Sequence, residues 1–198
     1  MDAQSLRYGD LAQLVEHLLC KQGVRGSIPL VSTNGLPPQM KGLHKMSSIN
    51  EIAESYKAAT EEFLATVKTL SESDLDKSVD GWSPRQVIHH LADSEAQSYA
   101  RLRRLIAEPG TTIQGYDENK WAESPTLGYE SQGIQDSLAV FTAVRKSSYE
   151  LIKRLTESQL DNTGTHTESG TYTVRNWLKS YTNHPIDHAN QVRVNIKK

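Results

Sequence analysis

Hydrophobic residues recur at steps of three and four positions along most of this chain, the spacing that places them on one face of an α-helix. One such segment covers residues 49–70. A second covers 84–106 and follows Ser83, a favourable N-cap, with proline at the first helical position. Two more cover 134–155 and 174–192. The pattern predicts an all-α protein folded as a four-helix bundle.

The segment between the second and third predicted helices has a different character. Residues 109–130 are rich in glycine and proline and contain Tyr116, Trp121 and Tyr129. We expect a long ordered loop here. Loops of this length in small domains often carry function, so this loop is predicted to form part of the wall of a site.

The two halves of the helical region share a short motif. Residues 70–76 read LSESDLD and residues 155–161 read LTESQLD. Each copy is followed by a glycine, a capping hydroxyl residue and an arginine at the start of the next predicted helix: Gly81, Ser83 and Arg85, then Gly170, Thr173 and Arg175. This repetition predicts a pseudo-twofold bundle. The alternative is that the motif is simply a common way to end a helix.

The N-terminal segment, residues 1–45, shows no sustained period that would join it to a core. It resembles the conceptual translation of a transfer-RNA gene. A D-arm sequence, GCT-CAG-TTG-GTA-GAG-CAC, encodes residues 12–17, and a T-arm sequence, GGT-TCG-ATT-CCC, encodes residues 26–29. We therefore expect translation to begin at Met46, so that residues 46–198 form the domain. The alternative is a natural extension, disordered or partly helical.

Composition limits the classes of function. The chain has 198 residues, 36% of them hydrophobic, and a formal net charge of −2, which does not favour a nucleic-acid partner. No apolar run approaches the roughly 20 residues that span a bilayer, and a secretory signal pattern is missing, so we expect a cytoplasmic protein. Cys20 is the only cysteine. Any bound metal must therefore be held by nitrogen and oxygen ligands.

Histidines provide the candidate chemistry. Four of the five histidines after residue 45 lie in two places, His89-His90 and His184-x-x-x-His188. The i,i+4 spacing puts His184 and His188 on one helix face, where they can share a divalent cation. A third ligand would come from another helix. Adjacent residues point about 100° apart on a helix, so only one of the first pair is expected there, and we choose His90, one turn from Val87.

Nearby residues could support such a site. Asp93 and Glu95 follow His90 on the same predicted helix and are candidate catalytic residues, as a general base or as groups that orient a ligand. The alternative is that they are solvated helix charges. Pro185 follows His184 directly and is expected to kink the helix. Arg101, with Arg103 and Arg104, is expected to form a solvated face.

The chain resembles the DinB-like superfamily of four-helix bundles, and within it the YfiT-like group of metal-dependent hydrolases. The resemblance rests on residues 81–94, on Tyr116-Asp117-Glu118-x-x-Trp121, and on Tyr181-x-x-His184-x-x-x-His188. It implies a site for nickel or zinc at three histidines, namely His90, His184 and His188, with a metal-bound water. Homodimers are frequent in this family, so the resemblance also implies a homodimer here.

The resemblance leaves the reaction open between hydrolysis and transfer of a low-molecular-weight thiol, such as bacillithiol, to an electrophile. The chain departs from the family where Pro185-Ile186-Asp187 separates the ligands, and at Glu95, where a histidine can occur. Our leading interpretation is a metal-dependent hydrolase acting on a small molecule, without nucleic-acid or membrane partners. The alternatives are a thiol S-transferase and a non-catalytic metal-binding or dimerisation bundle.

Overall fold

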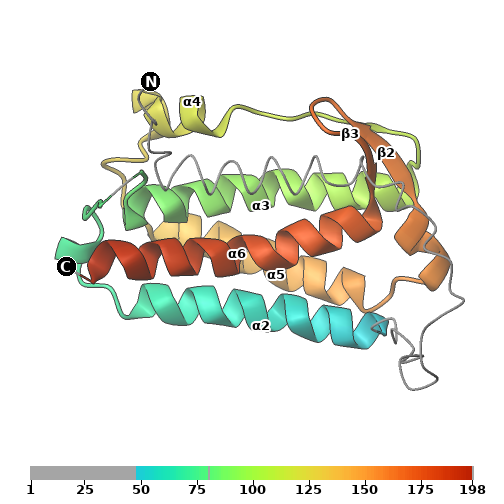
Figure 1. Cartoon of the computed structure of the whole chain (residues 1–198), viewed down its shortest axis with the longest axis horizontal. Helices are drawn as coiled ribbons and strands as arrows, with labels where there is room; N and C mark the ends of the chain where they lie inside the picture. The colour runs from blue at the N-terminus through green and yellow to red at the C-terminus, as the bar shows by residue number, and fades with distance from the viewer. Residues whose placement is uncertain (1–47, 80, 198) are drawn as a thin grey trace, which may run out of the picture.

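The computed structural model describes residues 48–79 and 81–197, so the predictions made for residues 1–45 lie outside it. Four long helices dominate this part of the chain, and they confirm the predicted all-α four-helix bundle (Figure 1). They are α2 (Ile49–Lys68), α3 (Pro84–Ala107), α5 (Gln135–Ile152) and α6 (Val174–Ile196). The short elements are η2 (Glu72–Asp74), β1 (Thr112–Ile113), α4 (Glu118–Glu123), η3 (Pro125–Leu127), η4 (Glu157–Asp161), β2 (Thr163–His166) and β3 (Gly170–Thr173).

Local sequence sets where three of the long helices begin. Helices α2, α3 and α6 each start with a reciprocal capping box, in which the N-cap hydroxyl accepts from the third helical N–H and that residue's side chain accepts in return. The N-caps are Ser48, Ser83 and Thr173. Helix α5 has Ile134 at its N-cap, which provides no side-chain cap. Its position therefore depends more on packing than on its own ends.

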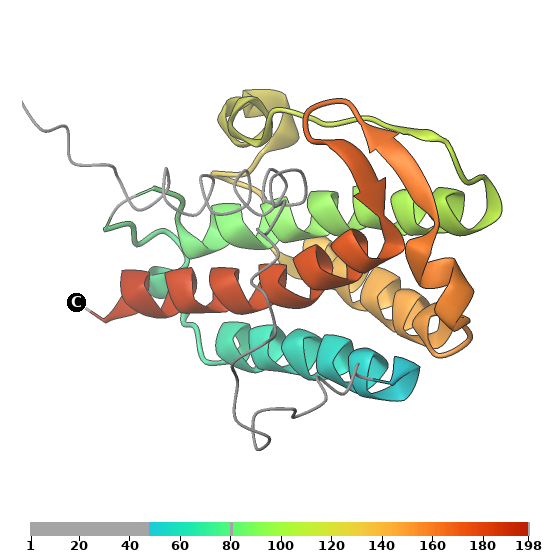
Figure 2. The same cartoon turned by 45° about the vertical axis from the view of Figure 1, so that its right-hand side comes forward.

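In the bundle, α2 lies diagonally across from α3, and α5 lies diagonally across from α6. Helices α2 and α3 each lie against both α5 and α6, as the two views in Figures 1 and 2 show. The hydrophobic core forms two clusters, one around Trp177 and Leu102, the other around Phe63 and Leu91. Buried polar side chains lie between these clusters along the bundle, including Glu95. Within the described residues, no helix has the length and apolar character that a membrane span requires.

The repeated motif makes the same contact twice. Arg85 Nε donates to Asp76 Oδ1 at 2.7 Å, and Arg175 Nε donates to Asp161 Oδ1 at 2.7 Å. In each half, this ion pair ties a 3₁₀ turn to the start of the next long helix. This agrees with the pseudo-twofold relation. The second half differs from the first because β2 and β3 lie between its turn and its helix.

A small sheet was not predicted from the sequence. Strand β1 pairs in parallel with β2, and β2 pairs antiparallel with β3. After α3 the chain passes along this sheet and returns over the bundle to α4 (Figure 2). Strand β2 has the sequence Thr-Gly-Thr-His, which is too short and lacks the hydrophobic alternation that would separate a strand from a loop. Gly164 permits the close pairing, since a Cβ there would lie 2.7 Å from the carbonyl oxygen of Thr111.

Replacing Gly164 should loosen this sheet. We expect Gly164→Ala to lower the free energy of unfolding by about 1–3 kcal/mol, because the added methyl group must displace backbone rather than a flexible side chain. Urea denaturation followed by circular dichroism measures this change. Thr171→Ala, at an exposed position of the neighbouring strand, is the control. An equal effect of both variants would contradict the steric explanation.

Candidate metal site

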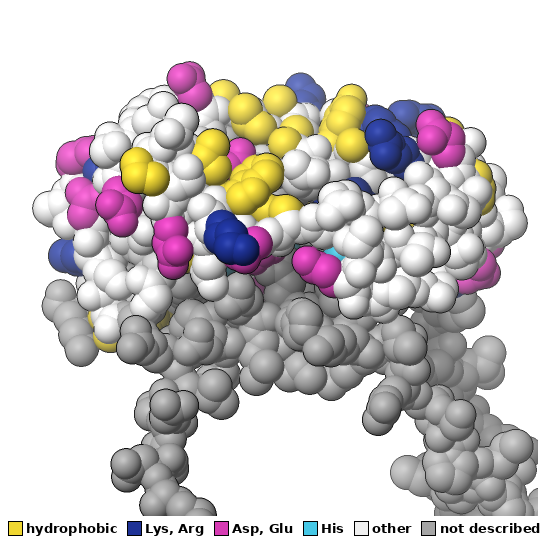
Figure 3. Space-filling view, turned by 90° about the horizontal axis from the view of Figure 1, so that it is seen from above, with side chains coloured by type: hydrophobic (Ala, Val, Ile, Leu, Met, Phe, Trp, Pro, Cys, Tyr) yellow, Lys and Arg dark blue, Asp and Glu magenta, His cyan; other side chains and the backbone are white. Residues whose placement is uncertain are grey.

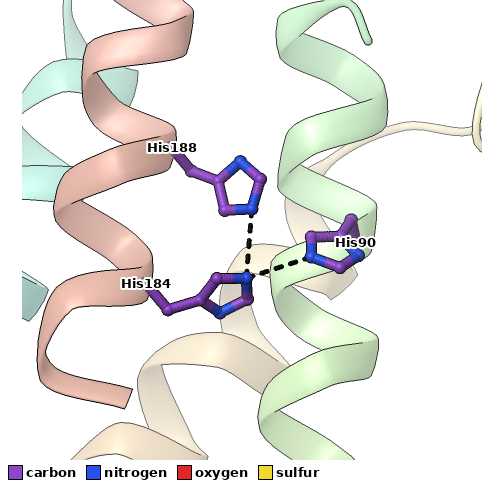
Figure 4. A group of neighbouring side chains, drawn as sticks. All are labelled: His90, His184 and His188. Atoms are coloured by element: carbon purple, nitrogen blue, oxygen red, sulfur yellow. Dashed lines mark hydrogen bonds between the residues drawn. The ribbon is translucent and has the colours of Figure 1, made fainter. Parts of the chain in front are cut away.

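Three imidazoles meet between α3 and α6 (Figure 4). His184 Nε2 lies 3.1 Å from His90 Nε2 and 3.0 Å from His188 Nε2. One ring nitrogen from each residue lies within 4.8 Å of the other two. The residues are only 1%, 8% and 6% exposed for His90, His184 and His188, respectively. The structure thus brings together the three histidines predicted as ligands.

The neighbouring histidine is directed elsewhere. His89 Nδ1 lies 2.8 Å from Ser137 Oγ, and His89 Nε2 lies 3.3 Å from the carbonyl oxygen of Gln132. It therefore joins α3 to the start of α5. The helical angle between adjacent residues separates its function from that of His90, as the sequence suggested.

Gln191 fixes the tautomer of one imidazole. His188 Nδ1 lies 2.8 Å from Gln191 Oε1, an amide oxygen that can only accept. The ring proton is therefore on Nδ1, and the Nε2 lone pair of His188 faces the other two histidines. Metal-binding histidines usually carry such a partner on the second nitrogen. Gln191 was not predicted from the sequence, although its position three residues after a candidate ligand on the same helix was an available signal.

Burial favours the neutral form of His90 and His184. Desolvation, and then the neighbouring His188 and His184, hold the pKa of His90 well below its ordinary value. Desolvation, and then the charge of Arg145, lower the pKa of His184 to about 3. A divalent cation requires neutral imidazoles, so at neutral pH the site is ready for one.

The donor geometry also fits a cation. His184 Nε2 has one proton or one lone pair to offer, yet it faces two nitrogens at hydrogen-bond distance. A hydrogen bond can therefore fully satisfy only one of the two contacts that His184 Nε2 makes with His90 and His188. One divalent ion that accepts a lone pair from each ring would satisfy all three together.

Aromatic rings flank the histidines. The Trp82 ring lies 4.6 Å from the His90 ring and stacks nearly parallel to His188 at 6.3 Å. Tyr181 meets His184 edge-on at 6.1 Å. On the face that carries α4 and the strands, hydrophobic side chains gather near the middle (Figure 3). The flanking Trp82 and Tyr181 rings and the low exposure of the histidines give the three imidazoles an enclosed, largely aromatic environment.

The two predicted catalytic carboxylates have different partners. Asp93 Oδ2 accepts from the Tyr129 hydroxyl at 2.6 Å, which fastens the 109–130 loop to α3. Glu95 is fully buried and accepts from Arg145 at 2.9 Å and from Ser98 Oγ at 2.8 Å. Burial raises the pKa of Glu95, and the Arg145 charge opposes that shift. Of the two, only Asp93 remains partly exposed.

The arginines of α3 do not form the common solvated face expected from sequence. Arg101 donates to the Tyr181 hydroxyl at 3.0 Å and to the Gln114 carbonyl at 2.7 Å, so it connects α3, α6 and the segment before α4. Arg103 lies over the Tyr99 ring, and its guanidinium carbon is 3.2 Å from the ring centre. The reason is that Gln114, in the segment that returns over the bundle, and Tyr181 on α6 both lie beside Arg101, which helical periodicity does not reveal.

These features define a class of protein, namely a four-helix bundle with a buried three-histidine centre. The model of the DinB superfamily matches residues 27–192, and the chain belongs to that superfamily. Bacillus subtilis YfiT, described as a probable metal-dependent hydrolase with an unusual four-helix bundle topology, has a similar structure. The TM-score is 0.69 and the sequence identity 26%, over 76% of this chain and 88% of YfiT.

Two relatives from Oceanobacillus iheyensis are named, provisionally, as metal-dependent hydrolases. The protein OB0782 is 37% identical over 125 residues, which are 62% of this chain and 71% of the relative. The protein OB0413 is 26% identical over 151 residues, which are 75% of this chain and 86% of the relative. These similarities extend over most of the bundle.

The metal-free protein should lose stability in mild acid. The lowered pKa of His184, about 3 in the folded state, means that the unfolded chain binds more protons below its ordinary value near 6.5. Stability is therefore full above about pH 6.5 and falls as the pH decreases towards the folded-state value. Urea titrations of chelator-treated protein at neutral and mildly acidic pH measure this loss. His184→Leu should show a smaller loss, and an equal one would contradict the assignment.

Removing the acceptor on His188 should weaken metal binding. We expect Gln191→Leu to lower zinc or nickel affinity by about 10- to 100-fold, because His188 loses the group that holds its proton on Nδ1. Competition with a chromogenic chelator gives the affinity. Gln191→Glu keeps an acceptor and should retain binding. Unchanged affinity in the leucine variant would contradict this function of Gln191.

Proposed function

We propose that this chain is a metal-dependent hydrolase that holds one nickel or zinc ion with the Nε2 atoms of His90, His184 and His188. The observation that carries the proposal is the convergence of three buried imidazoles, one with its tautomer set by Gln191. A nitrogen-only ligand set suits these metals. Three protein ligands also leave coordination positions for water and substrate, which a structural site would fill.

When bound, the ion supplies Lewis acidity and lowers the pKa of a water towards about 7. The protein supplies orientation and an enclosed environment. Gln191 holds the proton of His188 away from the centre, and the Trp82 ring shields His90 and His188 on one side. Asp93 is the general base we favour among the two predicted carboxylates, because it is partly exposed while Glu95 is buried and bonded to Arg145 and Ser98.

Metal content tests the ligand set directly. The purified full-length chain should carry about one equivalent of nickel or zinc after exposure to the metal and gel filtration, as measured by elemental analysis. His90→Ala, His184→Ala and His188→Ala should each lose it. His89→Ala is the matched control and should keep it, since its ring contacts Ser137 and Gln132. A folded wild-type protein that takes up neither metal would overturn the proposal.

Turnover separates the possible reactions. The metal-loaded protein should hydrolyse at least one member of a panel of model esters and amides without added thiol. Asp93→Asn should lower kcat by about 10²- to 10⁴-fold if the carboxylate is the general base. Consumption of a model electrophile only when a low-molecular-weight thiol is present would instead identify an S-transferase. Metal binding without any turnover would favour a non-catalytic bundle.

A further inference from the structure

One buried arginine connects all four long helices. Arg145 on α5 donates from Nη1 to Glu95 on α3 at 2.9 Å, and also to the backbone carbonyl of Tyr181 on α6. Its Nη2 donates to the carbonyl of Tyr56 on α2 at 2.8 Å, and its Nε to Thr60 Oγ1 at 2.7 Å. The side chains of Arg145 and Glu95 are both 0% exposed. This contact set lies in the polar layer between the two hydrophobic clusters.

The bond to Tyr181 has a specific cause in the sequence. In an α-helix, the carbonyl of a residue accepts from the N–H four residues later. For Tyr181 that residue is Pro185, which has no N–H, although α6 continues through it without a break. Arg145 therefore donates to the one carbonyl that the proline leaves without its normal helical donor.

The affected turn is also the one that carries a candidate ligand. His184 lies between Tyr181 and Pro185, and His188 lies on the following turn. The missing bond is thus next to the three-histidine centre, where the direction of the helix determines the direction of the imidazoles. Glu95 balances the charge of Arg145, and the Tyr56 ring lies 3.5 Å from the guanidinium carbon.

We propose that Arg145 is a positioning residue that replaces the N–H missing at Pro185 and so fixes the His184 turn of α6 against α3. Glu95 serves as its counter-ion, which gives this carboxylate an indirect function in place of the catalytic one expected from sequence. The link between Arg145 and Pro185 concerns the polypeptide alone. Its consequence for metal geometry rests on the function proposed above.

If the Arg145–Glu95 ion pair had no relation to Pro185, a different experimental result would be expected. Buried pairs can often be replaced together by neutral residues at little cost in stability. If the pair were independent of the helix, the effects of replacing it and of replacing Pro185 would add. If Arg145 substitutes for the missing donor, the two effects must be coupled.

A mutant cycle on chelator-treated, full-length protein tests this coupling. The pair is removed in Glu95→Gln/Arg145→Met, which leaves no unpaired buried charge, and each background is combined with Pro185→Ala. We expect the alanine N–H to compensate for the lost guanidinium, so that Pro185→Ala raises the folding equilibrium constant about tenfold more in the double variant than in the wild type. Asn190→Ala, an exposed α6 position, controls for helix propensity. Additive effects would overturn the proposal.

Cobalt(II) reports on the site itself. We expect the Glu95→Gln/Arg145→Met variant to bind Co²⁺ about tenfold more weakly, with altered d–d absorption bands, and Pro185→Ala to restore both. Coupled stabilities with unchanged spectra would overturn the positioning function while leaving the helix contact in place. Failure of the wild type to bind Co²⁺, Zn²⁺ or Ni²⁺ would refute the metal-site proposal, and the stability cycle would still decide the Arg145–Pro185 link.

Discussion

The packing of this bundle depends on the buried guanidinium group of Arg145, which bonds to the other three long helices. A buried cation is tolerated only where its charge is balanced and its N–H groups have acceptors. Here those acceptors come from α2, α3 and α6, while the arginine belongs to α5. Sliding or rotating any one helix would remove an acceptor from a buried donor. The hydrophobic clusters on either side supply the apolar burial, and the polar layer between them sets the register.

That register determines the three-histidine centre. His90 is on α3 and the other two histidines are on α6, so their nitrogens meet only if these helices hold a fixed axial alignment. Because α2 lies diagonally across from α3, and α5 from α6, helices α3 and α6 are neighbours despite their distance in the chain.

The two halves carry different residues at matching positions of α3 and α6. His184 and His188 lie nine and thirteen residues after Arg175, and the same steps from Arg85 lead to Ser94 and Ser98. Both serines are buried, at 1% and 0% exposure. The first half thus keeps small polar residues at positions where the second half carries candidate ligands, and the volume of two imidazoles is accommodated on one side only.

The segment that covers the bundle is fastened by a few polar contacts. Tyr129 bonds to Asp93, and Arg101 bonds to the Gln114 carbonyl and the Tyr181 hydroxyl. The short sheet anchors the beginning of this segment beside β2. These contacts join the covering segment to α3 and α6, the helices that carry the histidines.

The sequence alone determined the features that depend on neighbours within a few residues. Hydrophobic periodicity and caps located the four long helices to within a few residues of their ends, and the i,i+4 spacing paired His184 with His188. Only the tertiary structure decided the partner of Glu95, because Arg145 lies 50 residues away and no periodicity links them. The bond from Arg145 to Tyr181 and the short sheet depended equally on contacts between distant segments. Such contacts form only after helices pack, when a buried polar group must accept whichever partner the packing brings.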